Sequence, residues 1–211
     1  MVDLLGATGR ETLGGPALTL GDVRDHDRGH DRDRLAGLIR SRAVVPGRVT
    51  LASGREADYY VDLRRVTLDG EAAPLVGRVM LDLVADLLAD GVSAVGGLTM
   101  GADPVAAAML HAAAADGRRL DAFVVRKATK EHGLQRRIEG PDVAGRRVLA
   151  VEDTSTTGGS VLAAVAALRE AGADVVAVAV LVDRGTGAAE RIAEAGVGYR
   201  AAYGLPDLDL I

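Results

Sequence analysis

The chain has 211 residues, of which 48% are hydrophobic and 26% charged, and these values fit one globular domain with a sizeable core. A net charge of −5 argues against a general nucleic-acid-binding protein, and the absence of cysteine excludes disulfides and thiolate chemistry. The longest apolar stretches, such as residues 175–182, are too short to span a membrane, and no secretory signal pattern is present. We therefore expect a cytoplasmic protein that binds neither nucleic acid nor membranes.

The first 31 residues are predicted to form a disordered tail, followed by one domain over residues 32–211. Gly14-Gly15-Pro16 interrupts any early element, and residues 22–34 are rich in Asp and Arg with little apolar content. His26 and His30 are four residues apart and flanked by aspartates, so a metal site is conceivable. A solvated, mobile segment is the favoured interpretation, because a charged sequence of low hydrophobicity does not support packing.

The rest of the chain predicts an α/β fold. A short helix near residues 35–42 precedes a hairpin-like region at residues 49–63 and a helix at residues 76–88 that Gly91 ends. Strands are then expected at residues 92–99, 121–126, 147–153, 175–183 and 199–203, separated by helices at residues 104–115, 158–171 and 188–195. This alternation, with continuous β-branched runs, predicts a central parallel sheet flanked by helices.

Ligands of such sheets bind at the carboxyl ends of the strands. We therefore expect one crevice lined by the segments Thr99–Asp103, Arg126–Lys130, Glu152–Ser160 and Asp183–Thr186.

The most informative motif is Glu152-Asp153-Thr154-Ser155-Thr156-Thr157-Gly158-Gly159-Ser160, which follows an apolar run and precedes a helix-like pattern. A hydroxyl- and glycine-rich turn at a helix N-terminus binds phosphate through backbone N–H groups, with the hydroxyls as further donors. The two carboxylates are suited to accept hydrogen bonds from vicinal ribose hydroxyls or to help hold a cation. Neither the P-loop pattern nor the dinucleotide fingerprint is present, so the motif predicts a sugar-phosphate site.

A second motif is the segment of residues 126–137, named here the cationic loop, which carries five Lys or Arg residues in twelve positions. Taken alone, it would be an ordinary solvated charge run. Beside a phosphate site, it predicts a mobile loop that neutralises a pyrophosphate leaving group and excludes water. His132 in this loop is a candidate proton shuttle or phosphate donor, although a lone histidine is more often structural.

Together with Ser53-Gly54-Arg55 and Tyr59-Tyr60, these motifs resemble orotate phosphoribosyltransferase of the actinobacterial type, over about residues 34–208. The resemblance implies the type I phosphoribosyltransferase fold, with a small N-terminal hood at about residues 32–70 and a core at about residues 71–211. It also implies transfer of the phosphoribosyl group from phosphoribosyl pyrophosphate (PRPP) to orotate in pyrimidine biosynthesis. Expected products are orotidine 5′-monophosphate and pyrophosphate.

The resemblance also implies residue roles. The catalytic residues would be Lys127, Lys130, His132 and Asp153. PRPP would be bound by Arg126, Lys127, Lys130, His132, Glu152, Asp153, Thr154, Ser155, Thr156, Thr157, Gly158, Gly159 and Ser160. Orotate would contact Thr156, Arg184 and Tyr60, although Arg184 could instead pair with Asp183 and Tyr60 could simply pack. Mg2+ would be held mainly through PRPP, with Glu152 or Asp153 as candidate ligands. A homodimer is implied, in which the cationic loop acts across the interface.

The sequence departs from the family pattern at three positions. Ala52 and Gly101 stand where lysines are common, and Glu152 stands where Asp is common. Either the remaining cations of the site suffice to bind the phosphates of PRPP, or PRPP binds more weakly than it does in family members with these lysines. Two other functions stay open: a purine phosphoribosyltransferase, which would need a different base pocket, and a PRPP-sensing regulator that binds nucleic acid. The acidic balance and the presence of the cationic loop disfavour the regulator.

Overall fold

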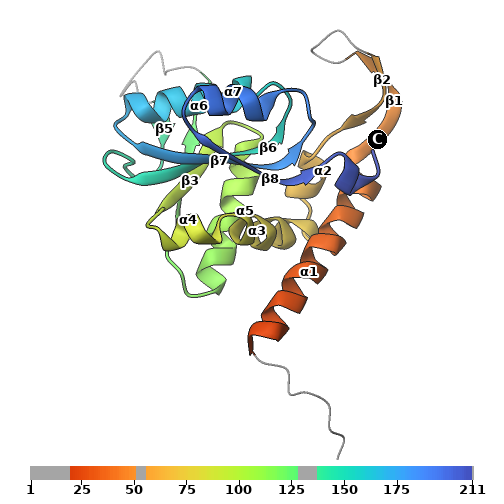
Figure 1. The fold of residues 1–211 in the computed structure, drawn as a ribbon, viewed down its shortest axis with the longest axis horizontal. Helices are drawn as coiled ribbons and strands as arrows, with labels where there is room; N and C mark the ends of the chain where they lie inside the picture. The colour runs from red at the N-terminus through yellow and green to blue at the C-terminus, as the bar shows by residue number, and fades with distance from the viewer. Residues whose placement is uncertain (1–19, 51–55, 128–136, 211) are drawn as a thin grey trace, which may run out of the picture.

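The computed structural model describes residues 20–50, 56–127 and 137–210, and it contains a six-stranded sheet beside a two-stranded hairpin (Figure 1). The strand order in the large sheet is β5-β4-β3-β6-β7-β8. All neighbours in it pair in parallel except β5, which is antiparallel to β4. The predicted parallel α/β sheet is therefore confirmed, with one short antiparallel edge strand in addition.

The strands are β1 (Val44–Thr50), β2 (Glu56–Val61), β3 (Ala94–Leu98), β4 (Asp121–Val125), β5 (Ile138–Glu139), β6 (Arg147–Ser155), β7 (Asp174–Asp183) and β8 (Gly198–Gly204). The helices are α1 (Leu20–Leu38), the π-helical turn η1 (Ile39–Ala43), α2 (Arg64–Thr67), α3 (Ala72–Leu83), α4 (Ala85–Ala89), α5 (Ala102–Ala115), α6 (Gly159–Glu170), α7 (Ala188–Glu194) and the 3-10 turn η2 (Pro206–Leu208).

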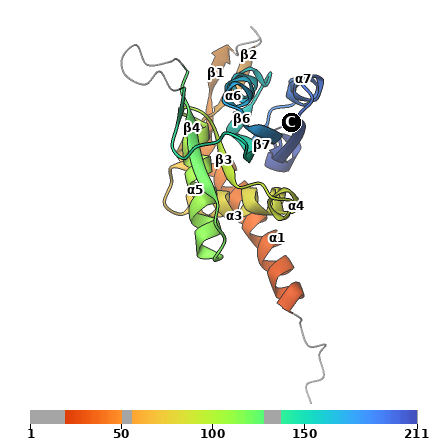
Figure 2. The ribbon, with the colours of Figure 1, turned by 90° about the vertical axis from the view of Figure 1, so that its left-hand side faces the viewer.

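Both faces of the sheet are buried, because successive strand residues alternate between two apolar clusters. In β6, Leu149 and Val151 pack with α1, α3 and α5, whereas Val148 and Ala150 pack with α6 and α7. Figure 2 shows these two groups of helices on opposite sides of the sheet. Burial on both faces explains why the strands are continuous apolar runs.

The hood predicted at about residues 32–70 comprises the last part of α1, η1, the antiparallel hairpin β1–β2 and α2, and it lies beside the β8 edge (Figure 1). Arg78 of α3 forms an ion pair with Asp31 of α1 at 2.5 Å. The Tyr203 hydroxyl of β8 donates to the Arg32 carbonyl at 2.7 Å, and the Arg32 guanidinium lies 4.6 Å from the centre of the Tyr203 ring. These contacts join the C-terminal half of α1 to the core.

The N-terminal prediction needs a change of boundary. Residues 20–31, which the sequence analysis assigned to the tail, are part of α1. Residues 1–19 lie outside the described residues, so disorder there stays a prediction, and the His26 side chain also lies outside the described part.

Among the described residues, no group of three His, Cys, Asp or Glu side chains could hold a metal ion. None of the helices in these ranges has the length and apolar character that crossing a membrane requires.

Two other expectations differ from the structure in detail. The helix expected at residues 76–88 is divided into α3 and α4, because Val84 leaves helical geometry with φ −118° and ψ 18°, and apolar spacing does not reveal such a break. Strand β6 extends through Thr154 and Ser155, which the sequence analysis placed in the turn, because these residues pair with Val182 and Asp183 of β7.

Candidate active site

The carboxyl ends of four neighbouring strands, β4, β3, β6 and β7, meet at one edge of the sheet. The Thr99 amide donates to the Val125 carbonyl at 2.8 Å, joining the residues that follow β3 to the end of β4. The Arg184 amide donates to the Ser155 carbonyl at 3.0 Å, joining the residue after β7 to the end of β6. The structure therefore brings together the four segments expected around the crevice, as far as they are described.

The phosphate loop, defined here as Thr156–Ser160, connects β6 to α6 and lines a cavity of about 60 Å³ together with Glu152. Gly158 precedes the first residue of α6 with φ 74°, a left-handed conformation that glycine adopts without steric cost. The first intrahelical bond runs from the Leu162 amide to the Gly158 carbonyl, so helix geometry leaves the amides before Leu162 without an intrahelical acceptor. Such amides, at the positive end of a helix, form an anion site.

Two buried carboxylates lie immediately before this loop. Glu152 is 6% exposed and Asp153 is 9% exposed. The Asp153 amide donates to Glu152 Oε1 at 3.2 Å, and the Thr154 amide donates to Asp153 Oδ1 at 2.7 Å. Burial, followed by the charge of Asp153, raises the pKa of Glu152 to about 8, and burial also raises the pKa of Asp153. A positive group is needed here to keep both carboxyls ionised at neutral pH.

Gly101, at the start of α5, lies directly against these carboxylates. A Cβ atom on Gly101 would be 2.5 Å from Glu152 Oε1 and 2.6 Å from Asp153 Oδ1, closer than non-bonded atoms approach. A lysine therefore does not fit at position 101 while the carboxylates keep these places. Nearby, the Thr99 hydroxyl donates to Asp103 at 2.7 Å, and the charge of Asp103 adds to the causes that raise the pKa of Glu152.

Comparison with known proteins gives a consistent result. The model of the phosphoribosyl transferase domain family matches residues 71–198. An orotate phosphoribosyltransferase of Streptomyces avermitilis is 73% identical over 180 residues, which are 85% of this chain and 97% of the relative. One of Mycobacterium tuberculosis is 60% identical over 182 residues, 86% of this chain and 98% of that relative. The chain belongs to the orotate phosphoribosyltransferase family.

Solved structures agree with this membership. The M. tuberculosis orotate phosphoribosyltransferase in complex with PRPP matches 85% of this chain and 99% of its own, with a TM-score of 0.73 and 56% identity. A phosphoribosyltransferase of Corynebacterium diphtheriae matches 86% of this chain and 99% of its own, with a TM-score of 0.76 and 56% identity. The resemblance, the type I phosphoribosyltransferase fold and the activity that the two motifs predicted are thereby confirmed.

In this orotate phosphoribosyltransferase family member, the structure describes only part of the cationic loop. Arg126 is half-buried, and its guanidinium lies 3.3 Å from Glu139 Oε1. Its amide donates to the Arg137 carbonyl at 2.8 Å, which closes the base of the loop. Lys127 is exposed at the end of β4. Lys130 and His132 lie outside the described residues, so their roles stay predictions, as does that of Ala52.

The predicted orotate residues come from three separate segments. Thr156 is exposed in the phosphate loop, Arg184 is half-buried after β7, and Tyr60 of β2 is 42% exposed. The Asp183 carboxylate accepts the Gly185 amide at 2.9 Å, and no ion pair with Arg184 occurs in the described part of the chain. Ser155, in contrast, is buried in β6, where its backbone carbonyl accepts the Arg184 amide, although it also lines the small cavity at the phosphate loop.

Two arginines beside the site had no distinguishing signal in the sequence. Arg64 of α2 has a raised pKa, first because of its hydrogen bond to Asp62 and also because of the charges of Tyr60 and Asp153. It therefore brings the hood within electrostatic reach of the buried carboxylates. Arg191 of α7 donates to the Thr157 carbonyl at 2.8 Å. Neither arginine belongs to a recognisable motif in the sequence, and only the folded structure shows that both lie beside the site.

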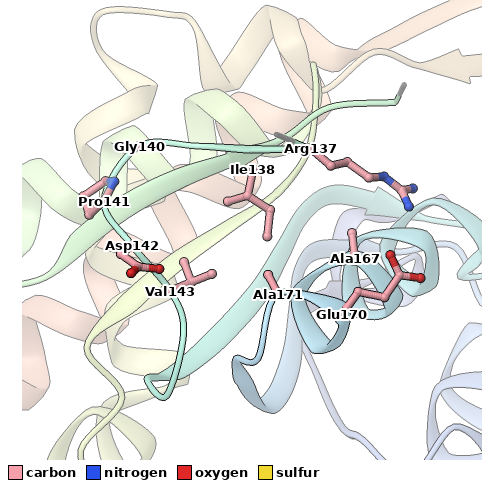
Figure 3. A pocket seen from close by; sticks show the side chains of 9 residues that line it. All are labelled: Arg137, Ile138, Gly140, Pro141, Asp142, Val143, Ala167, Glu170 and Ala171. Atoms are coloured by element: carbon pink, nitrogen blue, oxygen red, sulfur yellow. The ribbon is translucent and has the colours of Figure 1, made fainter. Parts of the chain in front are cut away.

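A second cavity, of about 420 Å³, lies between the segment after β5 and the end of α6 (Figure 3). Ile138, Val143 and Ala167 line its apolar part, and Arg137 and Glu170 stand at one side. None of the predicted PRPP or orotate residues lines this cavity. This cavity is larger than the one at the phosphate loop, but it is not lined by the residues that the sequence analysis expected to bind substrates.

Proposed function

We propose that the chain transfers the 5-phosphoribosyl group of PRPP to orotate, giving orotidine 5′-monophosphate and pyrophosphate in de novo pyrimidine biosynthesis. The observation that carries this proposal is the buried Glu152–Asp153 pair immediately before a phosphate loop at a helix N-terminus. The two carboxylates can accept hydrogen bonds from a pair of ribose hydroxyls, and the loop beside them can bind a phosphate, so the arrangement suits a ribose phosphate. Relatives that share 60% to 73% of their residues with this chain are named for orotate, which supports the choice of base.

The phosphate loop binds the 5′-phosphate of PRPP through its amides and hydroxyls, and Glu152 and Asp153 accept hydrogen bonds from the ribose hydroxyls. In the reaction, the bond from the anomeric carbon to pyrophosphate breaks, and orotate N1 attacks from the opposite face and loses its proton, for which His132 is the candidate acceptor. Positive charge develops on the ribose ring as this bond breaks. Two carboxylates in a water-poor environment favour that charge more strongly than they would in water.

The cationic loop neutralises the leaving pyrophosphate. Arg126 and Lys127 stand at its first positions, and Lys130 and His132 follow. Closure of such a loop also excludes water from the reacting carbon. We propose that the protein is a cytoplasmic homodimer in which Lys127 or its neighbours act on the site of the partner subunit.

Orotate is held by Arg184, Thr156 and Tyr60. The planar guanidinium of Arg184 pairs with the orotate carboxylate through two parallel hydrogen bonds. The half-buried position of Arg184 at the end of β7 supports this role, since no described carboxylate takes the guanidinium instead. Thr156 lies between the phosphate and base sides of the site, and Tyr60 adds a ring from the hood.

Mg2+ fits this donor set as a cation held mainly by the substrate. Mg2+ usually takes one or two carboxylates together with phosphate oxygens and water. The described residues offer the adjacent carboxylates of Glu152 and Asp153 but no cage of three ligating side chains. When bound, the ion would help neutralise the departing pyrophosphate and keep these buried carboxyls ionised.

The direct test is to mix the protein with PRPP, Mg2+ and orotate and to follow the loss of orotate absorbance. Adenine, hypoxanthine and uracil are run beside it. Consumption of orotate with release of pyrophosphate is the expected result. Turnover of a purine instead of orotate would support the PRPP site but show that the base specificity is for purines. Tight PRPP binding without turnover of any base would favour a regulator.

A further inference from the structure

The phosphate loop is supported from outside by α7, which follows it by about thirty residues in the chain. Arg191 of α7 donates from its terminal nitrogen to the Thr157 carbonyl at 2.8 Å. Beside it, a Cβ atom on Gly158 would be 3.4 Å from the Ile192 side chain and 3.6 Å from the Ala188 backbone. Ile192 and Ala188 are both buried, so this face of α7 is packed and not free to move away.

The bonded carbonyl matters for the neighbouring amide. The Thr157 carbonyl and the Gly158 N–H belong to one peptide group, and this N–H is one of the donors at the start of α6. A charged donor on the carbonyl oxygen polarises the peptide, so its N–H becomes a better donor. The same bond fixes the plane of the peptide, and therefore the direction in which the Gly158 N–H points. Arg191 also adds positive charge beside an anion site.

We propose that Arg191 is a positioning residue for the 5′-phosphate of PRPP, acting through the Thr157–Gly158 peptide and without contact to the reacting atoms. The inference rests on the proposed role of the phosphate loop. It assigns part of the affinity for PRPP to a side chain outside the loop, on the next helix of the sheet.

The chain offers a matched control. Arg169 of α6 donates to the Ala195 carbonyl at 3.1 Å. Like Arg191, it is an exposed arginine whose side chain joins the regions of α6 and α7 through a backbone carbonyl. The Arg169 contact lies at the C-terminal end of α6, whereas the phosphate loop lies at the N-terminal end of that helix. Loss of either arginine should affect the docking of α7 in a similar way, but only Arg191 touches the loop.

The experiment measures steady-state kinetics and inhibition by ribose 5-phosphate, which carries the 5′-phosphate without the pyrophosphate. Arg191→Ala should raise the KM for PRPP and the inhibition constant of ribose 5-phosphate about threefold to tenfold, as for one net hydrogen bond. Its kcat and its KM for orotate should stay within about twofold, and Arg191→Lys should recover part of the loss. Arg169→Ala should leave both PRPP-side constants unchanged.

Two outcomes would overturn the inference: unchanged ribose 5-phosphate inhibition in Arg191→Ala, or an equal change in Arg169→Ala. Ser160→Ala separates this failure from failure of the proposed site. If Ser160→Ala weakens ribose 5-phosphate and Arg191→Ala does not, the loop assignment holds and the role of Arg191 is wrong. If neither variant weakens it, the phosphate loop is not the 5′-phosphate site, and the inference fails with it.

Discussion

Replacing Gly101 by alanine would test how closely catalysis depends on the placement of the two buried carboxylates. Gly101 has φ −66° and ψ −40°, which alanine adopts freely, so the backbone should not change. The new Cβ would stand 2.5 Å from Glu152 Oε1 and 2.6 Å from Asp153 Oδ1. Both carboxylates must therefore shift by roughly 1 Å to reach ordinary contact distance.

The expected loss is large in activity and small in stability. Misplacing a catalytic group by about 1 Å costs on the order of 100-fold, so kcat/KM for PRPP should fall roughly 10- to 100-fold. Two side chains forced from their rotamers cost about 1–3 kcal/mol, and replacing glycine in a helical position returns about 0.5–1 kcal/mol. The difference is a net cost of at most about 2.5 kcal/mol, so with roughly 2–4 °C for each kcal/mol in a chain of this size Tm should fall by no more than about 10 °C.

Two other glycines make the test specific. Gly70 has no atom within 4 Å of its Cβ position, so Gly70→Ala should change neither activity nor Tm appreciably. A Cβ on Gly97 would collide with the backbone carbonyl of Val151, so Gly97→Ala should fail mainly by unfolding. The assays are initial rates over a range of PRPP concentrations and thermal unfolding. A Gly101→Ala protein with kcat/KM within twofold of the parent would refute the reasoning.

Three further predictions concern charged residues of the site. Lys127→Ala should lower kcat about 100-fold and raise the KM for orotate much less, whereas an unchanged kcat would remove this lysine from the mechanism. Arg184→Ala should raise the KM for orotate about 10- to 100-fold, and an effect confined to PRPP would contradict its assignment. The pKa of Glu152 is raised from 4.5 to about 8, so the folded state binds this proton more tightly than the unfolded state. The stabilisation is therefore complete below about pH 4.5 and lost as pH rises to about 8. Glu152→Gln should flatten the fall of Tm across this range in the absence of substrates, and identical pH profiles would contradict the buried-acid interpretation.

Local sequence patterns were sufficient to predict the sheet and the strand–turn–helix geometry of the phosphate loop. Buried parallel strands such as β6 and β7 are apolar runs of strand length, and a glycine with positive φ at the start of α6 follows a hydroxyl-rich turn. Both signals lie within a few neighbouring residues. Because parallel strands share one direction, the order of the segments also predicted that their carboxyl ends would meet.

Contacts between distant segments could not be predicted in the same way. The steric match of Gly101 with Glu152, the position of Arg64 near Asp153, and the bond from Arg191 to Thr157 each depend on the folded geometry. The absence of a lysine at position 101 was interpreted from sequence as a missing phosphate contact. The structure does not test that interpretation, and it adds that Glu152 and Asp153 fill the space that a side chain there would need.

The contacts of the hood have a consequence for how the chain folds during synthesis. The Tyr59 hydroxyl donates to the Leu210 carbonyl at 2.9 Å, Arg40 donates to the Asp207 carbonyl at 3.2 Å, and Tyr203 holds the end of α1. The hood thus precedes the core in the chain, but it finds these partners only at residues 203–210, which follow most of the core. These contacts of the hood can therefore form only after most helices and strands of the core have been synthesised.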